Sequence, residues 1–302
     1  MNKKLKKILF FPFRLFITFI KMLLFNLLII SIITLYGVYI SYNGLTTSSY
    51  EINNNKLNDN TNIVLISDLH NNKIGKNNNK LIKNIKSISP DLILVAGDML
   101  NDDSENSKIV TNFMKKLSKD YKVFYSLGNA ELDYISLGTS DLVKELENSG
   151  VTVLHNEYED IVIYGKVIRI GGMYDYAFGL KNKGDNLTEP NQKLVYKFLS
   201  DFEDTHNYKI MLSHRPDSFI FQDATKDWDI DLVVSGHTHG GQVVIPFVGG
   251  LYVGDQGFFP EYDKGRFNLN DTEVIITSGL GSGKQILPRF NNIPEVIDIK
   301  LN

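Results

Sequence analysis

The chain of 302 residues contains no cysteine. This absence excludes disulfide bonds, thiolate zinc sites and cysteine nucleophiles, and it is compatible with either an oxidising or a reducing compartment. The first 50 residues contain no acidic side chain, and they contribute +6 to a chain whose net charge is −3. Residues 51–302 therefore carry −9, and an acidic body of this kind argues against a nucleic-acid partner.

Charge is also missing between Met22 and Tyr42, over 21 predominantly apolar residues. A helix rises about 1.5 Å per residue, so this run is long enough to cross the hydrocarbon core of a bilayer. No small-residue cleavage site follows it, which distinguishes it from a secretory signal peptide. We expect a transmembrane anchor at 22–42, preceded at 1–21 by a basic interfacial leader in which Pro12 breaks any helix.

The distribution of charge around the apolar run predicts its orientation. All the early basic residues precede the run, and the first charge after it is Glu51. The positive-inside rule then places the N-terminus in the cytoplasm and the body outside it, as a single-pass protein of the cell membrane. Residues 43–61 are polar and lack periodicity, so we expect a tether there and one domain at 62–302.

Five short apolar runs in this domain, rich in Val, Ile, Leu or aromatic residues, predict buried strands. They lie at 62–67, 91–97, 122–128, 208–213 and 230–236. Helical patterns alternate with them at 78–88, 105–119 and 140–150. This alternation indicates an α/β domain with mixed sheets.

Metal-capable side chains collect at the ends of these runs, where the loops of an open α/β sheet converge on one crevice. They are two carboxylates, one amide and four imidazoles: Asp68, His70, Asp98, Asn129, His214, His237 and His239. This sulfur-free set suits Mn²⁺, Fe²⁺ or Zn²⁺ better than Ca²⁺. Seven ligands suit two divalent ions that share a bridging carboxylate, and such a pair can clamp a phosphoryl group.

In these residues the chain resembles the calcineurin-like metallophosphoesterases, whose pattern runs D-x-H, G-D, G-N-H-[DE], H and G-H-x-H. The chain reads DLH, GD, GNAE, H and GHTH in that order, and the resemblance covers residues 62–300. The sequence GHTHGGQ, the loop at 251–265 and the tail at 277–301 resemble a membrane-anchored bacterial subgroup. Members of that subgroup include proteins described as hydrolysing nucleotide-sugar lipids such as UDP-diacylglucosamine.

The resemblance implies a four-layer αββα sandwich of two mixed sheets and a metal-dependent hydrolase of phosphoric esters. It implies two sets of metal ligands that share Asp98 as the bridge. The first set is Asp68, His70, Asp98 and His239, and the second is Asp98, Asn129, His214 and His237.

The chain departs from the family pattern at Ala130, where the family has a histidine that stabilises the transition state or protonates the leaving oxygen. Loss of a positioned acid costs about 10²–10⁴ in rate. The substrate then has a good leaving group, or another residue donates the proton, or the protein binds a phosphorylated ligand with little turnover. The candidate donors are Glu131, Asp133, Tyr134 and His155. The full set of ligands favours an enzyme, because buried charge is costly to retain without use.

The sequence also bears on the substrate. Arg215 follows a predicted ligand directly and is suited to bidentate binding of phosphate. The glycine-rich aromatic segment 249–267 is either a loop packed on the sheet or a lip that faces substrate and membrane. We expect a phosphodiester or pyrophosphate substrate near the lipid surface. The alternatives are a soluble phosphoester and a ligand-binding protein without activity, and the oligomeric state stays open.

Overall fold

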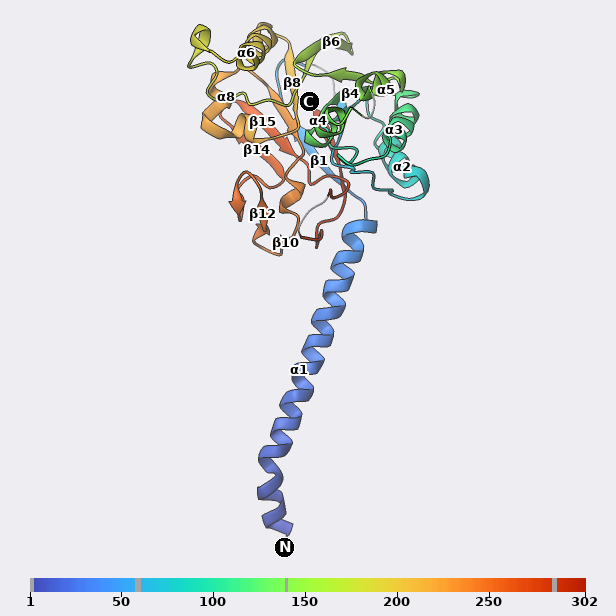
Figure 1. Ribbon diagram of the computed structural model, residues 1–302, viewed down its shortest axis with the longest axis vertical. Coiled ribbons are helices and arrows are strands. Elements are labelled where there is room, and N and C mark those ends of the chain that lie inside the picture. Colours follow the sequence, from blue (N-terminus) through green and yellow to red (C-terminus); the bar gives the residue numbers. More distant parts are fainter. Residues whose placement is uncertain (1–2, 58–60, 139–140, 284–286) are drawn as a thin grey trace.

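The computed structural model describes residues 3–57, 61–138, 141–283 and 287–302. It shows a long N-terminal helix and, at the end of that helix, an α/β domain (Figure 1). Two six-stranded mixed sheets lie at the centre of the domain, and helices cover their outer faces. The predicted αββα sandwich behind an apolar helix is therefore confirmed.

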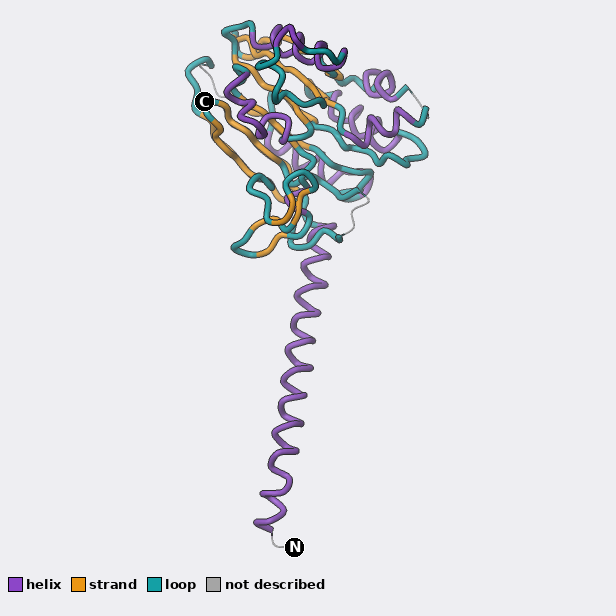
Figure 2. Tube along the Cα trace, turned by 60° about the vertical axis from the view of Figure 1, so that its left-hand side comes forward, coloured by secondary structure: helices purple, strands orange, loops and turns teal. Residues whose placement is uncertain are grey.

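Helix α1 (Lys3–Asn43) is continuous and stands away from the domain (Figures 1 and 2). The expectation that Pro12 breaks it is wrong. Proline removes one backbone donor from the helix, and the hydrogen bonds of the other turns carry the helix past that gap. The segment Phe11–Asn43 is long and apolar enough to cross a membrane, and its side chains are largely exposed.

The first sheet has the strand order β1-β16-β2-β3-β4-β5. These strands are β1 (Thr46–Ile52), β16 (Glu295–Leu301), β2 (Thr61–Ile66), β3 (Leu92–Val95), β4 (Lys122–Ser126) and β5 (Thr152–Leu154). Strands β2 to β5 are parallel, and β16 is antiparallel to β2. The outer face is covered by α2 (Asn79–Ile88), α3 (Lys108–Ser118) and α5 (Leu142–Asn148).

Strand β1 lies inside the stretch 43–61 that we expected to be a tether, so that expectation fails for Thr46–Ile52. The strand pairs in parallel with β16 at the edge of the sheet, and Ser49 donates a hydrogen bond to Asp298 at 2.9 Å. Its side chains are mostly polar because an edge strand meets solvent along one side, and only Ile52 is fully buried. Such a strand lacks the apolar run by which the other strands were predicted.

The second sheet has the strand order β14-β15-β9-β8-β7-β6. These strands are β14 (Gly265–Leu269), β15 (Thr272–Ile276), β9 (Leu232–Ser235), β8 (Tyr208–Ser213), β7 (Lys166–Met173) and β6 (Glu157–Ile163). The four central strands are parallel, and both edge strands are antiparallel to their neighbours. The outer face is covered by α6 (Pro190–Glu203), α7 (Asp217–Ile220) and α8 (Ala224–Asp227).

The strands that carry the predicted ligands, β2, β3, β4, β8 and β9, are buried on both faces, which explains why they appear in the sequence as continuous apolar runs. In β2, Ile63 and Leu65 point into the core between the two sheets, while Val64 and Ile66 pack under the helices of the first layer. This alternation follows from the two-residue period of a strand. The carboxyl ends of the parallel strands are thereby fixed as one rigid platform.

The remaining elements lie in the loops. Two small hairpins, β10 (Val244–Ile245) with β11 (Gly249–Gly250) and β12 (Tyr252–Val253) with β13 (Gly257–Phe258), lie at the end of the domain from which α1 emerges (Figures 1 and 2). Helix α4 (Asn129–Ser136) follows β4. Short 3₁₀ turns are η1 (Lys76–Asn78), η2 (Gly184–Asn186), η3 (Phe221–Asp223) and η4 (His239–Gly241).

Candidate metal centre

The predicted ligands all follow the carboxyl ends of parallel strands, where the two sheets face each other. Asp68 follows β2, Asp98 follows β3, and Asn129 begins the helix after β4. From the second sheet, His214 follows β8, and the pair His237 and His239 follows β9. The topology thus brings residues that are up to 171 positions apart in sequence to one end of the domain.

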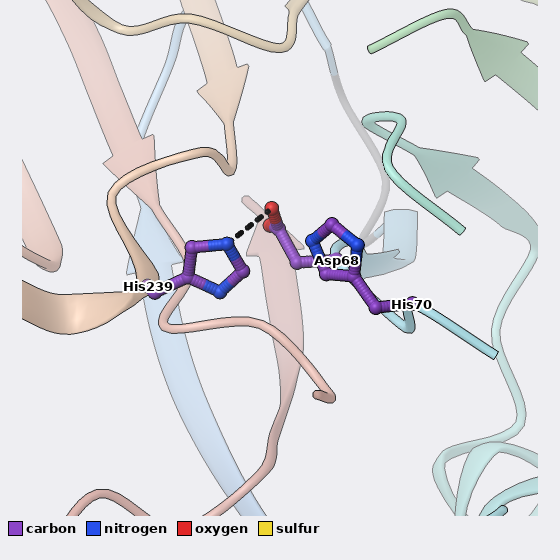
Figure 3. Close-up of side chains that lie close together, drawn as sticks. All are labelled: Asp68, His70 and His239. Carbon is purple, nitrogen blue, oxygen red and sulfur yellow. Dashed lines mark ion pairs between the residues drawn. The ribbon is translucent and has the colours of Figure 1, made fainter. Parts of the chain in front are cut away.

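Asp68 lies between two imidazoles. Its carboxylate and one nitrogen each of His70 and His239 lie within 4.8 Å of one another. His239 Nε2 is 3.6 Å from Asp68 Oδ1, and the two rings stack with centroids 5.1 Å apart (Figure 3). All three side chains are at least nine-tenths buried. This group contains three of the four residues predicted for the first ion.

Asp98 also lies between two imidazoles. Its Oδ2 is 3.6 Å from His70 Nε2 and 3.4 Å from His214 Nε2, which is too long for a hydrogen bond. Two ligands about 2.1 Å from one tetrahedral ion lie about 3.4 Å apart, so the spacing fits a shared metal. Among the described residues, neither of these buried nitrogens has a hydrogen-bond partner. Such orphaned atoms are explained if each of the two histidines shares a divalent ion with Asp98.

Three imidazoles are oriented by hydrogen bonds at Nδ1, which leave Nε2 facing the carboxylates. The partners of Nδ1 are Asn101 Oδ1 for His70 at 3.1 Å, the carbonyl oxygen of Ala96 for His214 at 2.6 Å, and that of Gly281 for His239 at 3.3 Å. Outer partners of this kind fix the tautomer and direction of metal-binding histidines. The donor set therefore fits divalent metal ions.

His237 is oriented differently. Its Nδ1 lies 3.0 Å from Asn129 Oδ1, and its Nε2 lies 3.0 Å from Asp255 Oδ2. Asp255, on the loop between β12 and β13, also accepts a hydrogen bond from Arg215 at 2.8 Å. Asp255 is a residue that the sequence reasoning missed. The available signal was that it is the first charge after the uncharged residues 240–254 of a loop that resembles the family subgroup.

The backbone is strained at most of the ligands. Five of the seven have positive φ: Asp68 at 53°, His70 at 47°, Asp98 at 54°, His237 at 68° and His239 at 48°. Non-glycine residues rarely adopt this conformation, and where they do it is often at functional sites. Two glycines allow the backbone to pass close to these ligands. A Cβ on Gly128 would collide with Asp98 Oδ1, and one on Gly236 would collide with the Asp68 carboxylate.

Burial and charge act in opposite directions on the central groups. Burial raises the pKa of Asp98, but the charges of His214 and His70 outweigh it and hold that pKa below its usual range. Burial lowers the pKa of His214, but Asp98 outweighs it and raises the value to about 10. Burial lowers the pKa of His239 to about 4, so this imidazole is neutral and ready to bind a metal. An arriving ion therefore has to displace the His214 proton.

A cleft of about 220 Å³ opens over this centre. Its lining comprises His70, Asp98, Asn101, Asp102, Asn129, Ala130, Asp133, His237, His239 and Gly283. Ala130 forms part of the wall, and its backbone N–H donates to Asp98 Oδ1 at 2.8 Å. The departure from the family pattern thus lies in the cleft itself. Asp133, one helical turn after Ala130, lies at the same wall.

Glu131 does not fit the predicted role of a proton donor. Its carboxylate is fully buried and accepts hydrogen bonds from four groups. These donors are the backbone N–H groups of Asp98, Met99 and Gly128, at 2.7, 2.7 and 2.8 Å, and the hydroxyl of Tyr125 at 2.7 Å. Burial and the nearby Asp98 charge raise its pKa. Glu131 therefore holds the Asp98 loop in place from behind the site.

Two other predicted auxiliary residues, His155 and Arg215, lie in different parts of the structure. His155 is exposed after the outermost strand β5 and lines a different surface groove with Asn156 and Glu157, so the structure does not bring it to the site. The guanidinium of Arg215 stacks over Tyr176 at 4.6 Å and contacts Asp255, which places it next to the metal ligands. Its role in binding phosphate stays a prediction.

Comparison with known proteins agrees with this geometry. The model of the calcineurin-like phosphoesterase family matches residues 61–241. The chain is 27% identical to the uncharacterized metallophosphoesterase YkuE of Bacillus subtilis, over 72% of this chain and 69% of that protein. It is 30% identical to the uncharacterized metallophosphoesterase Cj0846 of Campylobacter jejuni, over 86% of this chain and 65% of that protein.

A further relative is the phosphodiesterase YaeI of Escherichia coli, 29% identical over 70% of each chain. Among solved structures, the 5'-nucleotidase precursor of Thermus thermophilus matches 80% of this chain and 54% of its own, with 17% identity and a TM-score of 0.47. The chain belongs to the calcineurin-like phosphoesterase family. It is a metal-dependent hydrolase of phosphoric ester bonds.

Proposed function

We propose that the protein is a membrane-anchored phosphoesterase that uses two divalent ions to hydrolyse a phosphodiester or pyrophosphate bond of a lipid-linked substrate. The observation that carries this proposal is the position of Asp98 between the unpartnered Nε2 atoms of His70 and His214. Bound Mn²⁺, Fe²⁺ or Zn²⁺ would neutralise phosphoryl charge and activate water. The first ion would be held by Asp68, His70, Asp98 and His239, and the second by Asp98, Asn129, His214 and His237.

The residues of the chain have distinct tasks in this proposal. Asp98 would be the ligand shared by both ions, and Glu131 fixes its backbone. Asp255 keeps His237 turned toward Asn129. Asp133 is the candidate proton donor that lines the cleft, one turn from Ala130. Tyr134 is buried and is not among the residues that line it. The family relative named as a phosphodiesterase supports a diester substrate.

The membrane part of the proposal rests on α1. The segment Phe11–Asn43 is long and apolar enough to span a bilayer. All six early basic residues precede its uncharged part, residues 22–42. We propose a single-pass anchor with the N-terminus in the cytoplasm and the catalytic domain outside. A reporter fused after Asn302 should be active only outside the cytoplasm, and activity only inside it would contradict this orientation.

The full-length protein in detergent tests the chemistry. After loading with Mn²⁺, elemental analysis should give about two ions per chain. The loaded protein should hydrolyse bis-p-nitrophenyl phosphate and a lipid pyrophosphate. Hydrolysis of the aryl diester alone would indicate a soluble substrate, and metal binding without hydrolysis of either would indicate a binding protein. One ion at saturation would contradict the two-ion arrangement.

A further inference from the structure

Exposed apolar side chains gather on the two small hairpins of the domain. We call this group the hairpin surface, and it consists of Phe247, Val248, Tyr252, Phe258 and Phe259. Phe247 is fully exposed and Phe258 is 69% exposed, although both are aromatic. Residues 243–254 contain no charged side chain. Asp255 is the one charged residue between Phe247 and Phe259. An exposed apolar patch of this kind on a folded domain marks an interaction surface.

The hairpins are tied to the end of α1 through the segment around Phe290. The Phe290 ring packs so closely on Gly37 of α1 that a side chain there would overlap it. The carbonyl oxygen of the same residue accepts a hydrogen bond from Val244 N in β10 at 3.0 Å. Ser41 Oγ, one turn further along α1, accepts a bond from Asn292 N at 3.0 Å. One short segment thus contacts both the helix end and the first hairpin.

Figures 1 and 2 show from two directions that both hairpins lie beside the end of α1 that enters the domain. We propose that the hairpin surface inserts into the interfacial region of the lipid bilayer, in the leaflet where α1 ends. This inference rests on the proposed membrane anchor. Aromatic side chains favour this depth of a membrane, and apolar faces bury about 5–10 Å into the boundary between headgroups and acyl chains.

A lipid bilayer is the occupant that the contacts favour over a protein partner. Phe290 contacts both the end of α1 and the first hairpin, and the hairpins lie beside that end of the helix (Figures 1 and 2). A bilayer that receives α1 therefore lies against the hairpins without any further partner. The exposed side chains of Phe247 and Val248 are at the tip between β10 and β11, within four residues of the contact with Phe290.

The hairpins also form the wall of the metal centre. Gly241 of the turn that carries His239 packs against the backbone of Gly250 in β11 so tightly that a Cβ would overlap it. From the second hairpin, Asp255 Oδ2 accepts a hydrogen bond from His237 Nε2 at 3.0 Å. The same two hairpins therefore carry the proposed contact with lipid and pack against the predicted metal ligands. The substrate class that suits this arrangement is a phosphoester whose apolar chain stays in the bilayer.

The absence of cysteine makes the full-length chain suitable for single spin labels. Separate variants carry a nitroxide at Phe258→Cys, Val248→Cys or Leu28→Cys of α1, in vesicles of phosphatidylethanolamine and phosphatidylglycerol. Leu194→Cys on α6 is the matched control, because Leu194 is 64% exposed and α6 lies at the opposite end of the domain (Figure 1). Collision rates are measured with oxygen, which concentrates in lipid, and with a nickel chelate, which stays in water.

At positions 258, 248 and 28 we expect high collision rates with oxygen and low rates with nickel, and at 194 the reverse. Free access of nickel to both 258 and 248 would overturn the proposed surface. Low rates with both reagents at these positions would also overturn it, because they would mean burial against protein. Access of nickel to position 28 would instead contradict the anchor. The collision rates do not depend on enzymatic activity, so they can be interpreted even if the catalytic proposal fails.

Discussion

Two pairs of predicted ligands in the metal centre differ in their exposure to solvent. We call Asp68 and His239 the buried half, and Asn129 and His237 the open half. Asp68 and His239 are almost fully buried, and the backbone of both has positive φ. Asn129 and His237 are partly exposed and line the cleft, and His237 is held by a carboxylate from a hairpin loop. The buried half is a rigid holder formed by the two sheets. The open half lines the cleft, and the departure at Ala130 lies in that half.

Asp98 joins the two halves, so its loss has the largest expected effect. We predict that Asp98→Ala abolishes binding of both ions and lowers activity by more than about 10³-fold, the upper end for removal of one transition-state donor. Elemental analysis and hydrolysis of bis-p-nitrophenyl phosphate measure this. Asp102→Ala is the control, because Asp102 lines the same cleft outside the predicted ligand set. A greater loss of metal in His70→Ala would show that the bridging assignment is wrong.

The second prediction concerns only the open half. Ala130→His should accelerate hydrolysis of alkyl phosphodiesters by about 10²-fold, because an alkoxide needs a proton when it leaves. Aryl diesters should gain much less, and metal content should stay unchanged. The measurement is kcat for both substrates before and after the change.

Asp133→Asn is the companion to this variant. If Asp133 donates the proton in the natural chain, Asp133→Asn should slow alkyl substrates, and Ala130→His should restore their rate. Equal acceleration of aryl and alkyl substrates by Ala130→His would indicate stabilisation of charge in the transition state. Unchanged rates in both variants would show that neither position handles the proton.

The smallest effect is expected at Asp255, which contacts His237 of the open half. Asp255→Asn keeps the shape of the side chain but weakens the hold on His237, so it should reduce affinity for one ion by about tenfold, the lower end for outer partners of metal ligands. Metal titration of the purified protein measures this. Glu261→Gln, at an exposed acid in the segment between β13 and β14, is the control. Equal loss of both ions in Asp255→Asn would argue against independent halves.

The sequence predicted the strands that carry the ligands because each of them is buried on both faces and reads as an apolar run. Asp68, Asp98 and His214 stand directly after such runs. The parallel sheet accounts for the convergence of Asp68 and Asp98, and the packing of the second sheet against the first adds His214. Strand β1 was missed because its polar side chains suit an edge strand and look like a loop. Its partner β16 lies about 250 residues away in sequence, and no local pattern reports that pairing.

The auxiliary residues could not be placed from local sequence. Glu131 stands two residues after Asn129, yet the first turn of α4 directs its carboxylate to the buried backbone behind Asp98. Asp255 reaches His237 only because its hairpin folds back over the turn after β9. Both outcomes depend on the direction of a side chain in three dimensions. The type of residue was informative in each case, and its orientation was not.

The positive φ angles of the ligands imply a conflict between stability and function. A histidine in the left-handed conformation costs about 1 kcal/mol or more, whereas glycine adopts it freely. Glycine at position 237 or 239 would remove this backbone cost, but it would also remove the imidazole on which the proposed metal binding depends. At these two positions the proposed chemistry therefore costs the fold free energy that a glycine would not.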